Sequence, residues 1–530
     1  MAARAERRPR RSAALAALAA LATIALSGCA TYRLDVPRPV SHAIAATEDT
    51  AIGRALQPAL AAHPGESAFA LLQYGSLAFL SRAALADLAE RSLDVQYYIY
   101  ETDDSGAVIA DRLLAAARRG VRVRLLVDDN NLVRSEDRLA TLAGHRNLEI
   151  RVFNPYRNRV RWMRPFEFGT SFGRVQRRMH NKIFAVDAQL AVIGGRNIGD
   201  DYFDLHRGVN FSDLEVLSAG PVAREAVESF DEYWNSPWAV PIEAFLKRAP
   251  TEAEADAVAA DIAAQAGRTE EVRESYAPVL AAMRALALGA QFEYWGEAEL
   301  LADPPDKIDE SRRAPSALLQ RVYGLWRTAK SEVLVESAYL VPLRAGAQLI
   351  ADRARAGVRV ALLTNSLAST DVVPVHAGYA KRRRELLLAG VELYEFQAEA
   401  RRRPGERRYF RRMATGASLH SKVMVIDRTL TWVGSFNIDP RSALINTELA
   451  VLVKSPALAA ATAELIESDL APDRAWRLSL EPPHARTGRM FWTGERDGQL
   501  VHLTGEPGAT HWQRFVAGVM RWIPGLDHFL

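Results

Sequence analysis

The chain has 530 residues, of which 49% are hydrophobic, and this is more than one typical core requires. Domains of about 150 residues predict roughly three structural units. The formal net charge of +3 excludes a polycation that coats nucleic acid through its total charge, so local charge matters more. The sequence contains a single cysteine, which excludes an intramolecular disulfide.

The N-terminus has the parts of a bacterial export signal in the required order. An arginine-rich stretch is followed by the apolar run 13–26, which is shorter than the ~20 residues that span a bilayer. Leu26-Ser-Gly-Cys29 then resembles a lipobox, whose cysteine carries the lipid. We expect a signal peptide over residues 1–28 and a lipid anchor on Cys29; an uncleaved anchor helix or a coincidental cysteine is the alternative. The chain would then face the periplasm of a bacterial cell envelope, with the outer membrane favoured because Ala30 is not Asp.

A linker over 29–60 leads to the first of two similar halves, which we place at residues 61–240. This half begins with an expected strand at 93–100 and an amphipathic helix through 111–119, which Gly120 ends. Further strands are predicted at 121–127 and 148–153. Residues from about 241 to 290 are Ala- and Glu-rich with helical periodicity, which predicts a helical connector over 241–310; a solvated linker is the alternative.

The second half, residues 311–475, repeats this order of elements. Its predicted elements are a strand at 332–339, a helix through 349–355, and strands at 358–363 and 391–396. Strand, helix, glycine and strand in both halves indicate an internally duplicated α/β protein. We expect two halves, each a mixed sheet flanked by helices, packed about a pseudo-twofold axis with one shared active site.

The C-terminal tail, residues 476–530, lacks this pattern until its last segment. Hydrophobic residues there recur at helical spacing, among them Trp512, Phe515, Val519 and Ile523. The spacing predicts an amphipathic helix, which either lies in a membrane interface or docks on its own protein.

One motif occurs once in each half. The first copy has His180, Lys182 and Asp187, followed by Gly-Gly-Arg-Asn197; the second has His420, Lys422 and Asp427, followed by Gly-Ser435-Phe-Asn437. All functional spacings are identical. One such motif alone is mostly coincidence, but two copies in equivalent positions of a repeat indicate a functional site.

The spacing places imidazole and ammonium groups together. Side chains two residues apart on a strand share a face, so each His and its Lys point into the same pocket. The Asp has the opposite parity and should hold structure away from the substrate. The Asn behind the glycine turn returns a carboxamide to the pocket.

Two such sets face to face supply the groups that phosphodiester exchange requires. One His attacks phosphorus and forms a phosphohistidine, and the other protonates the leaving alcohol. Lys182, Lys422, Asn197 and Asn437 are predicted to bind the phosphate oxygens. No carboxylate-rich cluster demands a metal ion, and no cofactor is expected.

Three further side chains are predicted to support the site. Glu215 and Glu448 are candidate partners for the second nitrogen of the two imidazoles, because Asp213-Leu-Glu215 mirrors Asn446-Thr-Glu448. Ser435 stands where the first copy has Gly195, so any contribution of its hydroxyl is asymmetric.

The paired motif resembles that of the phospholipase D superfamily. The stretches Ser92–Tyr98, Asp303–Lys307 and Ser337–Pro342 are similar to those of its cardiolipin synthase C-type branch. This resemblance implies a metal-free enzyme that moves a phosphatidyl group onto phosphatidylglycerol. It names His180, Lys182, Asp187, His420, Lys422 and Asp427 as catalytic. The donor would be a second phospholipid, such as phosphatidylglycerol or phosphatidylethanolamine, at a membrane surface.

Other readings of the motif remain open. Water in place of the lipid hydroxyl would make the chain a hydrolytic phospholipase D that releases phosphatidic acid. Arginine- and aromatic-rich loops at 156–178 and 401–412 suit anionic headgroups, nucleic acid or plain solvated surface. A metal-independent nuclease is disfavoured by the predicted lipid anchor, so no nucleic acid is expected as partner. An idle lipid-binding scaffold is disfavoured because both motifs are complete.

Overall fold

The computed structural model describes residues 32–523, apart from residues 34, 45, 131, 133–135, 160–163, 269, 290, 310–315, 401–414 and 484–485. The predicted signal peptide, Cys29 and the arginine-rich loop 401–412 lie outside the described residues. Among the helices that are described, none combines the length and the apolar character needed to cross a membrane.

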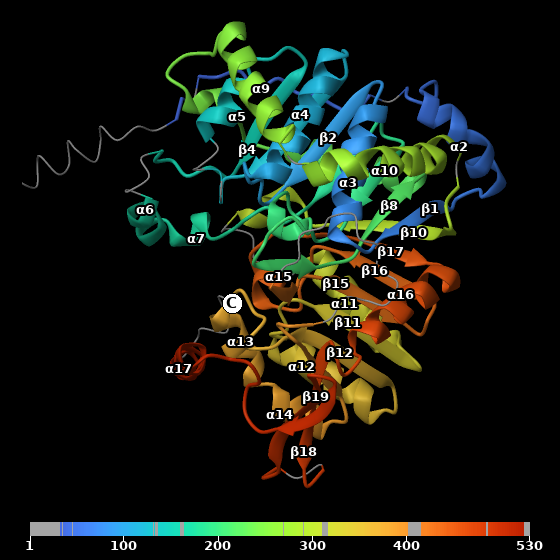
Figure 1. Ribbon diagram of the computed structural model, residues 1–530, viewed down its shortest axis with the longest axis vertical. Coiled ribbons are helices and arrows are strands. Elements are labelled where there is room, and N and C mark those ends of the chain that lie inside the picture. The colour runs from blue at the N-terminus through green and yellow to red at the C-terminus, as the bar shows by residue number, and fades with distance from the viewer. Residues whose placement is uncertain are drawn as a thin grey trace, which may run out of the picture.

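The two halves share one mixed sheet that runs through the whole molecule (Figure 1). Its hydrogen-bonded order is β9-β4-β3-β2-β5-β6-β8-β1 in the first half, then β10-β17-β16-β15-β11-β12-β13-β18-β19-β20 in the second. The first eight strands repeat in mirrored order as β18-β13-β12-β11-β15-β16-β17-β10. The predicted duplication is confirmed.

The first half contributes strands whose central members are parallel. They are β1 (Ser67–Leu72), β2 (Ser92–Tyr97), β3 (Arg122–Asp128), β4 (Leu148–Phe153), β5 (Ile183–Val186), β6 (Leu190–Ile193), β8 (Glu215–Ala219) and β9 (Ala239–Pro241). Its helices are α2 (Ala51–Ala62), α3 (Gly75–Leu88), α4 (Asp104–Arg118), α5 (Glu136–Leu142), α6 (Arg164–Thr170), α7 (Phe172–Val175) and α8 (Pro221–Trp234). The predicted strands at 93–100, 121–127 and 148–153 correspond to β2, β3 and β4.

The second half repeats this pattern. Its strands include β10 (Tyr294–Ala302), β11 (Glu332–Ser337), β12 (Arg359–Asn365), β13 (Glu392–Phe396), β15 (Lys422–Ile426), β16 (Leu430–Gly434) and β17 (Leu449–Lys454). Its helices are α11 (Ala317–Thr328), α12 (Arg344–Arg355), α13 (Val373–Ala380), α14 (Arg383–Leu388), α15 (Pro440–Leu444) and α16 (Pro456–Asp469). The four elements predicted here correspond to β11, α12, β12 and β13.

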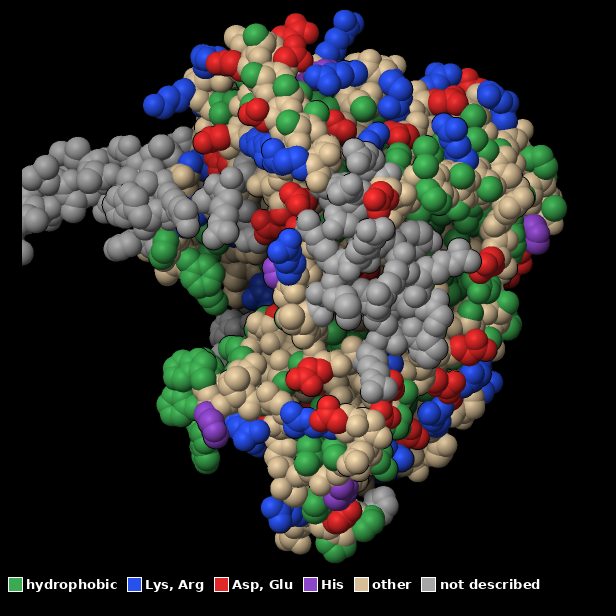
Figure 2. Space-filling view, viewed as in Figure 1, with side chains coloured by type: hydrophobic (Ala, Val, Ile, Leu, Met, Phe, Trp, Pro, Cys, Tyr) green, Lys and Arg blue, Asp and Glu red, His purple; other side chains and the backbone are tan. Residues whose placement is uncertain are grey.

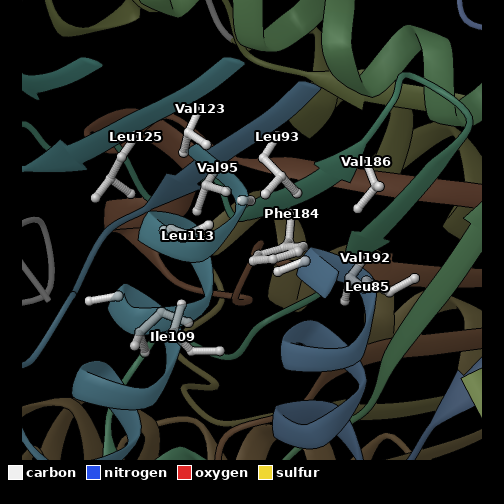
Figure 3. Packing of buried hydrophobic residues seen from close by; sticks show 14 of the residues in the cluster. Leu85, Leu93, Val95, Ile109, Leu113, Val123, Leu125, Phe184, Val186 and Val192 are labelled. Atoms are coloured by element: carbon white, nitrogen blue, oxygen red, sulfur yellow. The ribbon is translucent and has the colours of Figure 1, made fainter. Parts of the chain in front are cut away.

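Apolar residues from helices and strands form the core of the first half. Leu93 and Val95 of β2, Phe184 of β5 and Leu113 of α4 are fully or almost fully buried in one cluster (Figure 3). Burial of each such side chain contributes about 1.5–3 kcal/mol. In the parallel strands these apolar residues alternate with buried polar ones, such as Asp94 and Arg124, which bond to each other at 2.6 Å.

The predicted helical connector, 241–310, is wrong in its second part. It contains helices α9 (Glu252–Ala266) and α10 (Glu270–Gly289), but then strand β10 follows. This strand pairs on one edge with β1 of the first half and on the other with β17 of the second. Its alternation is weak because Gly296 and two glutamates interrupt the apolar residues, so the sequence did not reveal it.

The C-terminal tail also contains more order than its composition predicted. Strands β18 (Ala475–Glu481), β19 (Arg489–Arg496) and β20 (Gln499–Leu503) extend the sheet beyond β13 in antiparallel fashion. The predicted terminal helix is present as α17 (His511–Met520), which begins with a capping box of Thr510 and Gln513.

Candidate active site

Backbone pairing between the halves brings the two motifs together. The short strands β7 (Val209–Ser212) and β14 (Gly416–Leu419) run parallel, and the amide of His420 donates to the carbonyl of Ser212 at 2.7 Å. Met179 likewise bridges Thr447, and the amide of His180 donates to the Thr447 carbonyl at 2.9 Å. Each His is therefore fixed by the backbone of the opposite half.

Each imidazole is hydrogen-bonded to a buried carboxylate from the opposite half. Nδ1 of His180 lies 2.8 Å from Oε2 of Glu448, and Nδ1 of His420 lies 2.7 Å from Oδ2 of Asp213. Both carboxylates are fully buried. With Nδ1 engaged in this way, Nε2 of each ring is the nitrogen that faces a substrate.

Glu448 holds its predicted place, but Glu215 does not. The partner of His420 is Asp213, whereas Glu215 forms buried ion pairs with Arg82 at 2.7 Å and Arg196 at 3.3 Å. The predicted equivalence of residues 213–215 with residues 446–448 is therefore wrong by two residues. Strand pairing gives the true equivalence, because Ile193 pairs with Val216 while the matching Val433 pairs with Val451.

This corrected register explains the exchange of Gly195 for Ser435. A Cβ atom at Gly195 would lie 2.5 Å from Oδ2 of Asp213, so the carboxylate occupies the space of a side chain. In the second half the hydroxyl of Ser435 instead donates to the longer Glu448, which also accepts from Ser442 at 2.7 Å. A carboxylate thus lies beside the imidazole in both halves. Gly195 leaves room for Asp213 in one half, and Ser435 bonds to Glu448 in the other.

We expect Gly195→Ser to be harmful although the other half has serine at this position. The added side chain displaces Asp213 from His420 and costs about 1–3 kcal/mol of folding free energy through overpacking. Thermal unfolding of the variant should show a lower Tm. Gly324→Ala is the matched control, because a Cβ there meets no atom within 4 Å; equal Tm values for the two variants would contradict the assigned geometry.

Burial dominates the protonation of the basic groups. Desolvation lowers the pKa of His180 to about 4, against the opposing charge of Glu448, and lowers that of Lys182 to about 7. The pKa values of His420 and Lys422 are lowered for the same reason. Both Lys ammonium groups donate to the backbone carbonyl of the His two residues before, that of Lys182 at 2.5 Å.

The charges of these six groups favour an anionic substrate. With both imidazoles neutral, the two lysines balance Glu448 and Asp213. A phosphodiester adds one negative charge, and protonation of one imidazole restores the balance. Because uncompensated charge is expensive in a buried site, binding of the anion itself favours the imidazolium that a general acid needs.

The two motif aspartates lie away from the imidazoles, as strand parity predicted. Asp187 accepts from the backbone amides of Glu90, Arg91 and Ser92, at the start of β2. Asp427 does the same before β11, where it accepts from the amides of residues 330–332. Both therefore fix the turn that begins the central strand of their half.

The two asparagines are buried beside the motifs. Oδ1 of Asn197 accepts from the amide of Ile99 at 3.1 Å. Oδ1 of Asn437 has no hydrogen-bond partner among the described residues, although the residue is only 3% exposed. An unpaired polar atom at this depth is costly, which is consistent with a ligand site around Asn437.

Several contributors were missed by sequence reasoning. Rings of Tyr98 and of Tyr202 meet His180 and His420 edge to face at 5.1 and 5.2 Å. Asp303 accepts from the amide of Glu448 at 3.1 Å and pairs with Lys307 at 2.7 Å. The Asp303–Lys307 stretch therefore holds the backbone of Glu448, directly before strand β17. The composition of the stretch alone does not reveal this role.

The described part of the first arginine-rich loop is engaged within the protein. Arg159 pairs with Asp129 at 2.5 Å, Arg178 with Asp128 at 3.3 Å, and Arg174 with Glu167. These arginines therefore form ion pairs within the fold, in the segment before His180, rather than a free basic surface. In the portion of the chain that the structure describes, no three His, Cys, Asp or Glu side chains converge to hold a metal ion.

Comparisons with known proteins show the family and the fold of the chain. The family described as "Cardiolipin synthase, PLD-like domain" matches residues 83–234 and 325–470. Cardiolipin synthase C of Escherichia coli (strain K12) is 38% identical over 482 residues, which are 89% of this chain and 98% of that protein. Cardiolipin synthase B of the same strain is 25% identical over 74% of this chain and 80% of that protein. The crystal structure of phosphatidylserine synthase of Haemophilus influenzae Rd KW20 has the same fold, with a TM-score of 0.53 at 13% identity over 80% of this chain and 91% of its own.

Proposed function

Because the chain belongs to the cardiolipin synthase C-type branch of the phospholipase D superfamily, we propose that it transfers a phosphatidyl group onto phosphatidylglycerol to make cardiolipin. The observation that carries this proposal is the pair of imidazoles, each held at Nδ1 by a carboxylate of the opposite half. Two such groups allow one to bind phosphorus while the other handles protons.

His180 is proposed as the nucleophile. Its partner Glu448 has a lowered pKa, because the effects of His180, Lys182 and Ser435 together outweigh burial, and so stays anionic. Burial instead raises the pKa of Asp213. An anionic Glu448 supports the positive charge that His180 acquires when Nε2 attacks phosphorus.

In the first step the P–O bond to the donor headgroup breaks as the P–Nε2 bond forms. The headgroup alcohol, glycerol from phosphatidylglycerol or ethanolamine from phosphatidylethanolamine, takes a proton from the His420 imidazolium. Lys182 and Lys422 stabilise the charge on the non-bridging oxygens, together with Asn197 and Asn437.

In the second step the glycerol hydroxyl of phosphatidylglycerol replaces the imidazole. His420 removes the hydroxyl proton, the oxygen attacks phosphorus, and the P–N bond to His180 breaks. The product is cardiolipin, and both imidazoles return to their starting protonation. Water in place of the lipid hydroxyl would give phosphatidic acid instead.

We further propose that Cys29 anchors the protein at the periplasmic face of the cell envelope. This rests on the order of arginine-rich, apolar and lipobox segments in the sequence. An anchor of this kind keeps the site within reach of phospholipids.

The test is turnover of phosphatidylglycerol vesicles by the purified protein, with and without phosphatidylethanolamine, followed by mass spectrometry of the lipids. Cardiolipin is the expected product, and His180→Ala serves as the inactive control. Phosphatidic acid without cardiolipin would identify a hydrolase and contradict the transferase proposal. Cleavage of plasmid DNA that His180→Ala abolishes would point to a nuclease.

A further inference from the structure

Helix α17 has two apolar faces, and the residues that the structure describes cover only one of them. Ala517 and Met520 pack against the segment around α13, and Gln513 donates to the carbonyl of Leu367 at 3.1 Å. On the other face Trp512 and Phe515 stack on each other at 5.7 Å and are 70% and 61% exposed. Trp522 just beyond the helix is 87% exposed.

Exposed apolar side chains concentrate on this part of the molecule. Twelve large hydrophobic residues are exposed among those the structure describes, and seven lie on α6, α7, α17 or the turn after α17. They are Phe168, Phe172, Trp512, Phe515, Val519, Trp522 and Ile523. Figure 2 shows hydrophobic side chains gathered at the left over α6–α7 and over α17, on either side of a hollow.

Both groups connect directly to the candidate active site. Helix α7 ends five residues before His180, and Phe168 and Phe172 meet edge to face at 5.0 Å just ahead of it. Helix α17 docks on α13, which begins two residues after Asp371; the charge of Asp371 acts on Lys422. The two apolar groups thus come from the first half and from the C-terminal tail, and they lie on either side of the hollow in Figure 2.

We propose that these two groups, which we call the aromatic rim, insert into a phospholipid bilayer and hold the active site against it. The inference rests on the proposed function, because it takes the substrate to be a membrane phospholipid. Tryptophan and phenylalanine on an amphipathic helix suit the boundary between headgroups and acyl chains. A phosphorus atom lies at that boundary, so a rim on both sides lets a headgroup enter the hollow while its acyl chains stay in the bilayer.

Fluorescence quenching by lipids brominated on the acyl chain tests the insertion itself. The full chain is reconstituted in phosphatidylglycerol–phosphatidylethanolamine vesicles, with or without the brominated lipid. We expect Trp512→Phe/Trp522→Phe to lose most of the quenched emission of the parent protein. Trp295→Phe is the control, since Trp295 lies in strand β10 and stacks on His63 at 4.1 Å; it should leave the quenched emission unchanged.

This measurement needs no turnover, so it separates the rim from the proposed function. Quenching that depends on Trp512 and Trp522 without any cardiolipin formation would support the rim and contradict the proposed function. Quenching that is unchanged in Trp512→Phe/Trp522→Phe would overturn the rim, whatever the product of the enzyme.

A kinetic test asks whether the rim serves catalysis. The measured quantity is the ratio of turnover on vesicles to turnover on a short-chain phospholipid below its micelle concentration. We expect Phe515→Asp to lower this ratio about tenfold or more, because the variant loses one aromatic side chain that is buried in the bilayer when the protein is bound. Leu500→Asp is the matched control, because Leu500 is 70% exposed on β20 of the same C-terminal extension. An equal ratio in both variants would overturn the role of the rim.

Discussion

His180→Ala and His420→Ala are each expected to lower kcat by roughly 10³-fold or more, because nucleophile and proton carrier are distinct roles. Neither imidazole can take over both roles, since each is fixed by its own carboxylate, Glu448 or Asp213. Steady-state turnover of phosphatidylglycerol vesicles measures the loss. Circular dichroism of both variants should match the parent protein.

The two variants should differ in what they accumulate. With a phosphatidyl donor whose leaving group departs without a proton, rapid acid-free quenching and mass spectrometry of peptides should detect a phosphatidyl group on residue 180 in the His420→Ala protein, because transfer to the acceptor still needs a base. His180→Ala should carry no such group. A modified His420 in the His180→Ala protein would reverse the proposed roles, and full activity in either variant would contradict the shared site.

The second large effect separates Asp213 from Glu215. We expect Asp213→Asn to lower kcat about 100-fold or more, because an amide does not hold the imidazolium of His420 as a carboxylate does. Glu215→Gln should instead lower the free energy of unfolding by about 3–5 kcal/mol, because it leaves Arg82 and Arg196 buried with less compensation.

Turnover per folded molecule and thermal unfolding distinguish these outcomes. Asp213→Asn is expected to unfold close to the parent temperature and Glu215→Gln well below it. If Glu215→Gln lost turnover at unchanged stability while Asp213→Asn stayed active, the register given by the strand pairing would be wrong. The equivalence of residues 213–215 with 446–448 that the sequence predicted would then be correct.

The sequence predicted well what depends on local pattern. Apolar residues at alternate positions gave β2, β3 and β4 and their counterparts, since one face of each strand packs in a hydrophobic core. The spacing of His180 and Lys182 gave a shared pocket, because strand geometry fixes which side chains face together. The turn-binding role of Asp187 follows from the same parity.

What the sequence did not predict depends on contacts between distant strands. Strand β10 has a weak pattern and is stabilised by edges supplied by β1 and β17. The partner of His420 depends on register, and a shift of two residues keeps the same face, so parity cannot choose between Asp213 and Glu215. The brace from Asp303 to Glu448 spans 145 residues and has no local signal.

The pairing of β1 with β10 also constrains the order of events in turnover. Backbone hydrogen bonds join the two halves there. The halves therefore cannot open by a hinge motion without breaking these hydrogen bonds. We therefore expect the two imidazoles to keep their relative position through turnover, so that the acceptor reaches the same phosphorus that the released alcohol has left. If the proposed phosphohistidine forms between these fixed halves, the two lipids react one after the other, and the kinetics are expected to be ping-pong.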